Sequence, residues 1–210
     1  VNDSVTRQTI NNWVANFRMD ADFCNHPESR QHFDVWQFQT ADDSAGTSTF
    51  FGRMPAQIVE NLIWLYTEPG DIVRDPFAGG GTTIDVAKRM GRRVYASDLT
   101  PSTPTLPIHQ HDAVEPWPKI ASGQDKANLI LLDPPYWQQA KERYSDSADD
   151  LGNVSLERFD EAWAAVIANA KASLAEGGRI AFIISPTQVE DGSVVDHAFD
   201  MAAAAIKQAR

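Results

Sequence analysis

An unusual tetrapeptide follows an apolar run in the second half of the chain. Residues 129–132 read Leu-Ile-Leu-Leu, and residues 133–136 read Asp-Pro-Pro-Tyr. The two prolines stiffen the backbone and have no N–H group, so this turn offers carbonyl and carboxylate acceptors without donors. Such a cluster suits a substrate that donates hydrogen bonds, such as an exocyclic amine. The ring of Tyr136 offers a face for a planar heterocycle, and stacking of this kind contributes about 1–3 kcal/mol per base.

A glycine-rich turn lies earlier in the chain, where residues 75–83 read Asp-Pro-Phe-Ala-Gly-Gly-Gly-Thr-Thr. Three successive glycines indicate positive φ angles or the close approach of a ligand to the backbone. The nicotinamide pattern G-x-G-x-x-G is incomplete because Ile84 replaces its third glycine, and Thr82 follows the turn in place of a phosphate-binding lysine. Asp75 would repel a phosphate but could pair with an ammonium group. The turn therefore disfavours phosphate-bearing ligands.

Two further carboxylates extend this pattern. Asp98 follows Gly79 by about 20 positions, the offset at which an acidic residue binds ribose hydroxyls. Asp112 is placed to reach an adenine amino group from the next loop. Together these residues suit a nucleoside that carries a cationic amino acid and no phosphate, a description that S-adenosylmethionine fits. Its methyl sulfonium, in line with an amine held at Asp133, would complete a positioned displacement.

At these residues the chain resembles the amino-methyltransferases that modify adenine N6 or cytosine N4 in DNA. Residues 75–83 resemble their cofactor motif, and residues 133–136 resemble their catalytic (D/N/S)-P-P-(Y/F/W) motif. Residues 51–63, FGRMPAQIVENLI, resemble the helix that packs over the methionine part of the cofactor. The likeness covers about residues 50 to 185, and the motif order resembles the γ-like arrangement. The aspartate at position 133 favours adenine, because serine is commoner there in cytosine-N4 enzymes.

The resemblance implies two sets of site residues. The implied cofactor-binding residues are Arg53, Pro55, Asp75, Pro76, Phe77, Ala78, Gly79, Gly81, Thr82, Asp98, Leu99 and Asp112. The implied catalytic residues are Asp133, Pro134, Pro135 and Tyr136. The five histidines and one cysteine show no metal-ligand spacing, so we expect no metal site.

Alternating strand and helix patterns surround these motifs. Apolar periodicity predicts helices over 55–66, 82–91, 155–178 and 196–210, and strands over 71–77, 92–99, 127–133 and 179–185, with a short strand near residue 108. Weaker patterns predict a short helix over 9–19 and a short strand over 33–38. The alternation predicts a doubly wound α/β sheet with helices on both faces, the Rossmann-like class I methyltransferase fold that the resemblance implies. Ligands of such sheets lie beyond the carboxyl ends of the strands, where the three motifs fall.

We expect an N-terminal extension over residues 1–50 and a methyltransferase domain over residues 51–210. The family's sheet normally continues with two more strands, so the domain is expected to be truncated or to lack segments. A region that reads base edges is not recognisable. The net charge of −11 is unfavourable for holding nucleic acid by bulk electrostatics. Lys141 and Arg143, in the polar loop 138–153, could close over an extruded base.

Composition predicts a cytoplasmic protein, and the resemblance implies a bacterial or phage-encoded one. A single cysteine excludes an internal disulfide framework and fits a reducing compartment. The sequence contains neither an apolar run long enough to span a membrane nor a recognisable signal peptide. The resemblance also implies a role in restriction-modification, and the sequence leaves open whether the enzyme is linked to a nuclease or is solitary.

Several alternatives remain open from the sequence. The substrate could be cytosine N4 in DNA or guanine N2 in RNA, and a small-molecule methyltransferase would fit the negative charge. A non-catalytic partner subunit of the same fold is a further alternative. With DNA as partner, the base must be flipped out or single-stranded. A homodimer or a separate recognition partner would then supply what this chain lacks.

Overall fold

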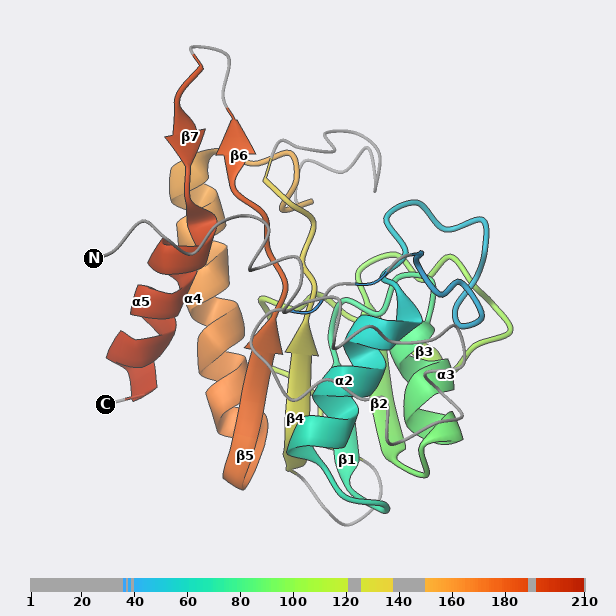
Figure 1. Ribbon diagram of the computed structural model, residues 1–210. Helices are drawn as coiled ribbons and strands as arrows, with labels where there is room; N and C mark the ends of the chain where they lie inside the picture. The colour runs from blue at the N-terminus through green and yellow to red at the C-terminus, as the bar shows by residue number, and fades with distance from the viewer. Residues whose placement is uncertain are drawn as a thin grey trace, which may run out of the picture.

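The computed structural model describes residues 36, 38, 40–120, 126–137, 150–188 and 192–209. Five parallel strands form its central sheet in the order β3-β2-β1-β4-β5. They are β1 (Ile72–Asp75), β2 (Arg93–Asp98), β3 (Ile108–Gln110), β4 (Ala127–Leu132) and β5 (Leu174–Phe182). Figure 1 shows them side by side with their carboxyl ends at the same edge.

Helices cover both faces of this sheet, which confirms the predicted α/β class (Figure 1). The helices are α2 (Ala56–Tyr66), α3 (Thr82–Arg89), α4 (Leu156–Ser173) and α5 (His197–Ala209). The buried strands alternate between two cores, because successive side chains of a strand point to opposite faces. Val73, Leu129 and Leu131 pack with α2 and α3. Ile72 and Ile130 pack on the other face with α4.

The order of strands places the functional motifs at a topological switch point. β1 is followed by β2 on one side, while its other neighbour is β4. Crevices form at the carboxyl ends of two such strands, because the chain connections leave them in opposite directions. β1 ends at Asp75 and β4 ends just before Asp133, so the fold brings the glycine turn beside the tetrapeptide.

Helix α4 is shorter than the predicted helix over residues 155–178. Ser155 caps its N-terminus, since the Ser155 hydroxyl accepts a hydrogen bond from the Arg158 N–H. The helix ends at Ser173, not near residue 177, because Leu174 pairs with Ala127 and begins β5. A register shift follows, in which Gly177 adopts a φ of +72° before pairing resumes at Arg179. Sheet pairing therefore overrides the helical pattern of residues 174–178.

A small antiparallel hairpin, β6 (Thr187–Gln188) with β7 (Val194–Val195), was not predicted. It extends beyond the carboxyl ends of the sheet (Figure 1). The predicted helix over 9–19 lies outside the described residues, as does most of the predicted strand over 33–38. None of the described helices is long and apolar enough to cross a membrane.

Residues 42–54 pack on the sheet domain and are here called the strap. The Asp42 N–H donates to the Gln57 side chain of α2, and Ala45 is buried in the same core as α2. The described C-terminal part of the expected extension over residues 1–50 is therefore packed into the core of the sheet domain. Other strap contacts reach the glycine turn and are part of the site.

Candidate active site

The glycine turn joins the end of β1 to the start of α3 and is fastened to the end of β2. Gly79 has a φ of +47° and Gly81 a φ of +84°, conformations that favour glycine. The carboxylate of Asp98 accepts hydrogen bonds from the Gly79 N–H at 2.8 Å and from the Thr100 N–H at 2.9 Å. Asp98, expected to bind ribose, thus also holds the turn in place.

The strap explains a second requirement for glycine. A Cβ atom on Gly79 would lie 2.7 Å from the ring of Phe50, and one on Gly80 would lie 2.9 Å from the Phe50 Cβ. Both distances are too short for real carbon contacts. The Thr47 N–H also donates to the Gly80 carbonyl at 2.8 Å. The turn is therefore glycine-rich in part because the strap packs directly on it.

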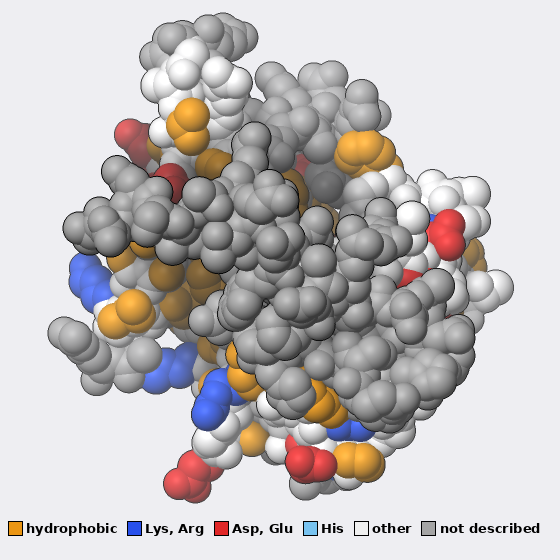
Figure 2. Space-filling view, in the orientation of Figure 1, with side chains coloured by type: hydrophobic (Ala, Val, Ile, Leu, Met, Phe, Trp, Pro, Cys, Tyr) orange, Lys and Arg blue, Asp and Glu red, His pale blue; other side chains and the backbone are white. Residues whose placement is uncertain are grey.

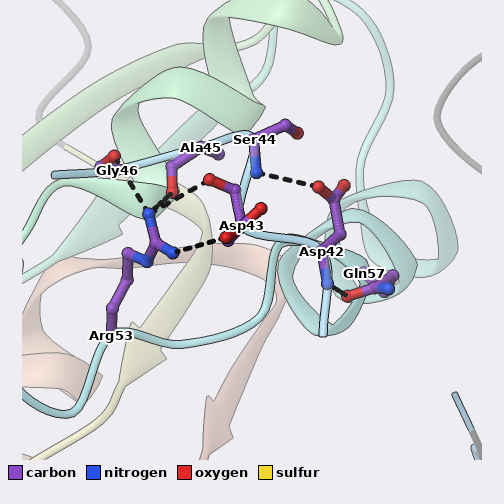
Figure 3. Close-up of polar contacts among 7 residues, drawn as sticks. All are labelled: Asp42, Asp43, Ser44, Ala45, Gly46, Arg53 and Gln57. Atoms are coloured by element: carbon purple, nitrogen blue, oxygen red, sulfur yellow. Dashed lines mark hydrogen bonds and ion pairs between the residues drawn. The ribbon is translucent and has the colours of Figure 1, made fainter. Parts of the chain in front are cut away.

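Arg53 organises the strap (Figure 3). Its guanidinium donates to the carbonyl of Asp43 at 3.1 Å and to those of Ala45 and Gly46 at 3.4 Å each. A charged contact with the Asp43 carboxylate, 3.7 Å from nitrogen to oxygen, adds to this set. The Gly46 N–H in turn donates to Asp85 of α3 at 2.9 Å. Arg53 also lines the cavity, while its charge is directed at the strap backbone.

The carboxylate at the end of β1 is held in a buried position. Asp75 accepts a hydrogen bond from the Phe77 N–H at 2.9 Å. The pKa of Asp75 is raised to about 6, chiefly by burial and to a smaller extent by the charge of Asp98, while the Thr83 side chain and the Phe77 N–H act in the opposite direction. A carboxylate so desolvated gains strongly from a cationic partner.

The tetrapeptide continues β4 into the same cavity. Burial raises the pKa of Asp133 to about 7, with a further contribution from the negative charge of Asp75, and a hydrogen bond from Tyr136 partly offsets both. After the tetrapeptide, the Trp137 indole N–H donates to the Val154 carbonyl at 2.9 Å. The Trp137 carbonyl accepts from the Thr187 hydroxyl at 3.1 Å. The end of β4 is thus tied to two distant segments.

The loop that carries Asp112 is anchored from the opposite face. Asp112 accepts from the Val114 N–H at 3.0 Å and lines the cavity. The side-chain amide of Asn169 on α4 donates to the carbonyls of residues 113–115, the shortest contact being 2.8 Å to Glu115. The buried guanidinium of Arg74 lies between the rings of Tyr95 and Trp117. These contacts give the loop a defined place beside the glycine turn.

One cavity brings most of the predicted site residues together. Those that line it are Arg53, Asp75, Pro76, Phe77, Ala78, Gly79, Thr82, Asp98, Leu99, Asp112, Asp133 and Pro135. Pro55, Gly81, Pro134 and Tyr136 lie next to lining residues without lining the cavity themselves. Lining residues that were not predicted are Phe50, Gly52, Met54, Gly80, Thr83, Thr100, Ser102, Ala113, Asp150 and Leu151. The aromatic residues just before Arg53 could have indicated the strap, whereas no sequence signal marked Asp150.

The cavity is acidic. Its described lining contains the carboxylates of Asp75, Asp98, Asp112, Asp133 and Asp150. The one cation among these lining residues is Arg53, which is engaged with the strap. This chemistry suits a ligand with positive charge and hydrogen-bond donors, and it is poorly suited to phosphates. Within the described part of the chain, no cluster of side chains is arranged to hold a metal ion.

The described surface has no corresponding basic face in the view of Figure 2. There the visible Lys and Arg side chains of the described residues are few, with some of them near one another at the lower left, and Asp and Glu side chains lie below them and elsewhere on the same face. This distribution agrees with the net charge of −11.

Comparisons with known proteins connect these features to one family. Residues 2–103 match the N6_N4_Mtase family model, described as DNA methylase. Over 74 residues the chain is 35% identical to the type II methyltransferase M.BglII of Bacillus subtilis, a match that covers 35% of this chain and 21% of that protein. Over 75 residues it is 37% identical to the type II methyltransferase M2.DpnII of Streptococcus pneumoniae, covering 34% and 27%. The chain thus spans about a quarter of the length of these relatives.

Among solved structures, TrmN from Thermus thermophilus is similar to 62% of this chain and to 38% of its own chain, with a TM-score of 0.45 and 21% identity. The family match includes the strap and the glycine turn, and it ends before the tetrapeptide.

Proposed function

We propose that the chain, which matches the DNA methylase family model over residues 2–103, transfers a methyl group from S-adenosylmethionine to the exocyclic amine of a DNA base, with adenine N6 favoured. One observation carries the proposal: the acidic cavity, which is poorly suited to phosphates, is lined by residues of the Asp-Pro-Pro-Tyr tetrapeptide at the end of β4. Aspartate at position 133 supports adenine as the target.

The residues of the glycine turn fit this cofactor. Their backbone leaves room for close approach of a ligand, and Asp75 offers a buried negative charge for an ammonium or sulfonium group. Asp98 and Asp112 offer acceptors for ribose hydroxyls and for an adenine amino group. When bound, S-adenosylmethionine supplies an electrophilic methyl group. The chain's task is to hold the acceptor in line with it.

Asp133 acts on the acceptor. Its carboxylate and a backbone carbonyl of the tetrapeptide accept hydrogen bonds from the amine, which frees the nitrogen lone pair for attack. The amine must lose one proton once its nitrogen has taken the methyl group. Asp133 can accept this proton, because a pKa of about 7 is matched to proton transfer near neutral pH.

The acceptor must reach the cavity as a single base. A base inside a duplex cannot do so, so a flipped or single-stranded base is the substrate form. A separate partner with basic residues would hold the DNA, since this chain, and equally any second copy of it, carries a net charge of −11.

The test is to incubate the chain with methyl-labelled S-adenosylmethionine and unmethylated DNA of mixed sequence, then to digest the DNA and separate the nucleosides. Label in N6-methyladenosine is the expected result. Label in N4-methylcytidine would keep the mechanism and change the base. Label in RNA alone would replace DNA as the substrate. Cofactor binding without transfer to either would favour a non-catalytic subunit, and the proposed activity would fail.

A further inference from the structure

A turn at residues 150–153 forms a wall of the cavity beside the tetrapeptide. Asp150 and Leu151 line the cavity together with Asp133 and Pro135. Only 5% of the surface of Asp150 is exposed. Burying a carboxylate is costly unless its interactions compensate, so this position calls for an explanation that the known motifs do not give.

Asp150 closes the turn with two hydrogen bonds. Its side-chain Oδ1 accepts from the Gly152 N–H at 2.8 Å. Its carbonyl accepts from the Asn153 N–H at 2.8 Å. Removal of the side chain would break the first of these two bonds and would loosen the half of the turn that faces the cavity.

The closed turn packs on the backbone of the tetrapeptide. A Cβ atom on Gly152 would lie 3.6 Å from the Cβ of Pro135 and 3.9 Å from the carbonyl oxygen of Tyr136. The hydrogen bond from Trp137 to Val154 fastens the following residues at 2.9 Å. The turn and the tetrapeptide are therefore held as one unit.

We propose that Asp150 is a positioning residue for the acceptor amine: it keeps the 150–153 turn against Pro135, and the turn sets where the amine lies relative to Asp133. The catalytic part of this inference rests on the proposed function. A misplacement of about 1 Å can slow a positioned reaction about 100-fold. Asp150 thus influences transfer through the acceptor side of the cavity and not through the glycine turn.

The test compares three variants of the full chain. Asp150→Ala removes the Oδ1 acceptor, whereas Asp150→Asn keeps an oxygen that can accept from Gly152. Asp71→Ala is the matched control, because Asp71 accepts from the Glu68 N–H at 2.9 Å in a turn before β1, away from the cavity. Each protein is titrated with S-adenosylmethionine, and the kcat and KM for DNA are then measured at saturating cofactor.

For Asp150→Ala we expect kcat/KM for DNA to fall by about tenfold or more with little change in cofactor affinity. Asp150→Asn should recover most of the rate, and Asp71→Ala should behave as the unmodified chain. Equal loss of cofactor binding and transfer would overturn the inference. So would unchanged transfer in Asp150→Ala, or failure of the asparagine to recover it.

Amide hydrogen exchange gives a readout that needs no activity. Exchange at Tyr136 and Trp137 should accelerate in Asp150→Ala and stay near that of the unmodified chain in Asp150→Asn. Unchanged exchange in Asp150→Ala would refute the role of the turn. Absence of transfer by the unmodified chain would instead refute the proposed function, so the two failures are distinguishable.

Discussion

The carboxyl group of Asp133 should make the folded chain less stable as the pH rises, and Asp133→Asn should remove this loss. Burial, followed by the charge of Asp75, raises its pKa in the folded chain to about 7 from the ordinary value of 3.8. An acid whose folded pKa is raised stabilises the fold fully below the unfolded pKa. That contribution disappears as the pH rises through the folded pKa, here between about pH 4 and pH 7.

The size of the effect follows from the two pKa values. Between about pH 5 and pH 8 the linkage amounts to about 2–3 kcal/mol, because the unfolded carboxyl is already ionised at the lower pH while the folded one ionises within the interval. Asp133 is partly exposed to the cavity, so the lower end of that range applies. Asparagine has nearly the same shape and does not ionise. Its stability advantage over aspartate should therefore grow by about 2 kcal/mol over this interval.

The assay is urea unfolding of both proteins at the two pH values, without cofactor. Glu176→Gln is the control, because Glu176 is an exposed carboxylate near the N-terminal end of β5, away from the cavity at the carboxyl ends of the strands. The difference in free energy of unfolding between Glu176→Gln and the unmodified chain should be the same at both pH values. A difference between Asp133→Asn and the unmodified chain that is the same at both pH values would refute the reasoning about desolvation.

Two further substitutions test the strap and the turn. Gly79→Ala should lower the free energy of unfolding by about 2 kcal/mol or more, since it adds a clash with Phe50 to the left-handed strain, and it should weaken cofactor binding. Gly91 also has a positive φ, but a Cβ atom there would meet only the Pro69 Cβ, at an ordinary 4.0 Å, so thermal unfolding of Gly91→Ala should show a loss of only about 1–2 kcal/mol. Arg53→Lys removes the guanidinium, whose Nη1 donates to three strap carbonyls while its Nη2 faces the Asp43 carboxylate, and it should weaken cofactor binding, measured by calorimetry, by about fivefold to tenfold. Arg158→Lys, on the exposed side of α4, should have no effect, and equal effects of the two arginine changes would count against the strap.

The sheet and the two main motifs could be predicted because their signals are local. Apolar strands that end in Asp75 and Asp133 indicate a parallel sheet, and the positions of both residues follow from strand polarity alone. The end of α4 could not be predicted, since the pairing of Leu174 with Ala127 is a contact between distant residues that the local helical pattern does not reveal.

The remaining parts of the site depend on tertiary contacts. The need for glycine at position 79 comes partly from the Phe50 ring, which lies far away in the sequence. Arg53 could be singled out by its motif, but the three carbonyls that it binds follow only from the path of the strap. Asp150 is one of several aspartates in a polar stretch, and its burial beside Pro135 becomes visible only in the fold.

We propose that the glycine turn and Asp133 have separate roles: the glycine turn holds the cofactor, and Asp133 acts on the acceptor amine. The most direct measurement compares Asp133→Ala with the unmodified chain in two parallel experiments, a titration with S-adenosylmethionine and single-turnover methyl transfer to DNA. We expect Asp133→Ala to bind S-adenosylmethionine with nearly the affinity of the unmodified chain and to lose methyl transfer. Equal loss of cofactor binding and transfer would show that Asp133 belongs to the cofactor site and would contradict the account.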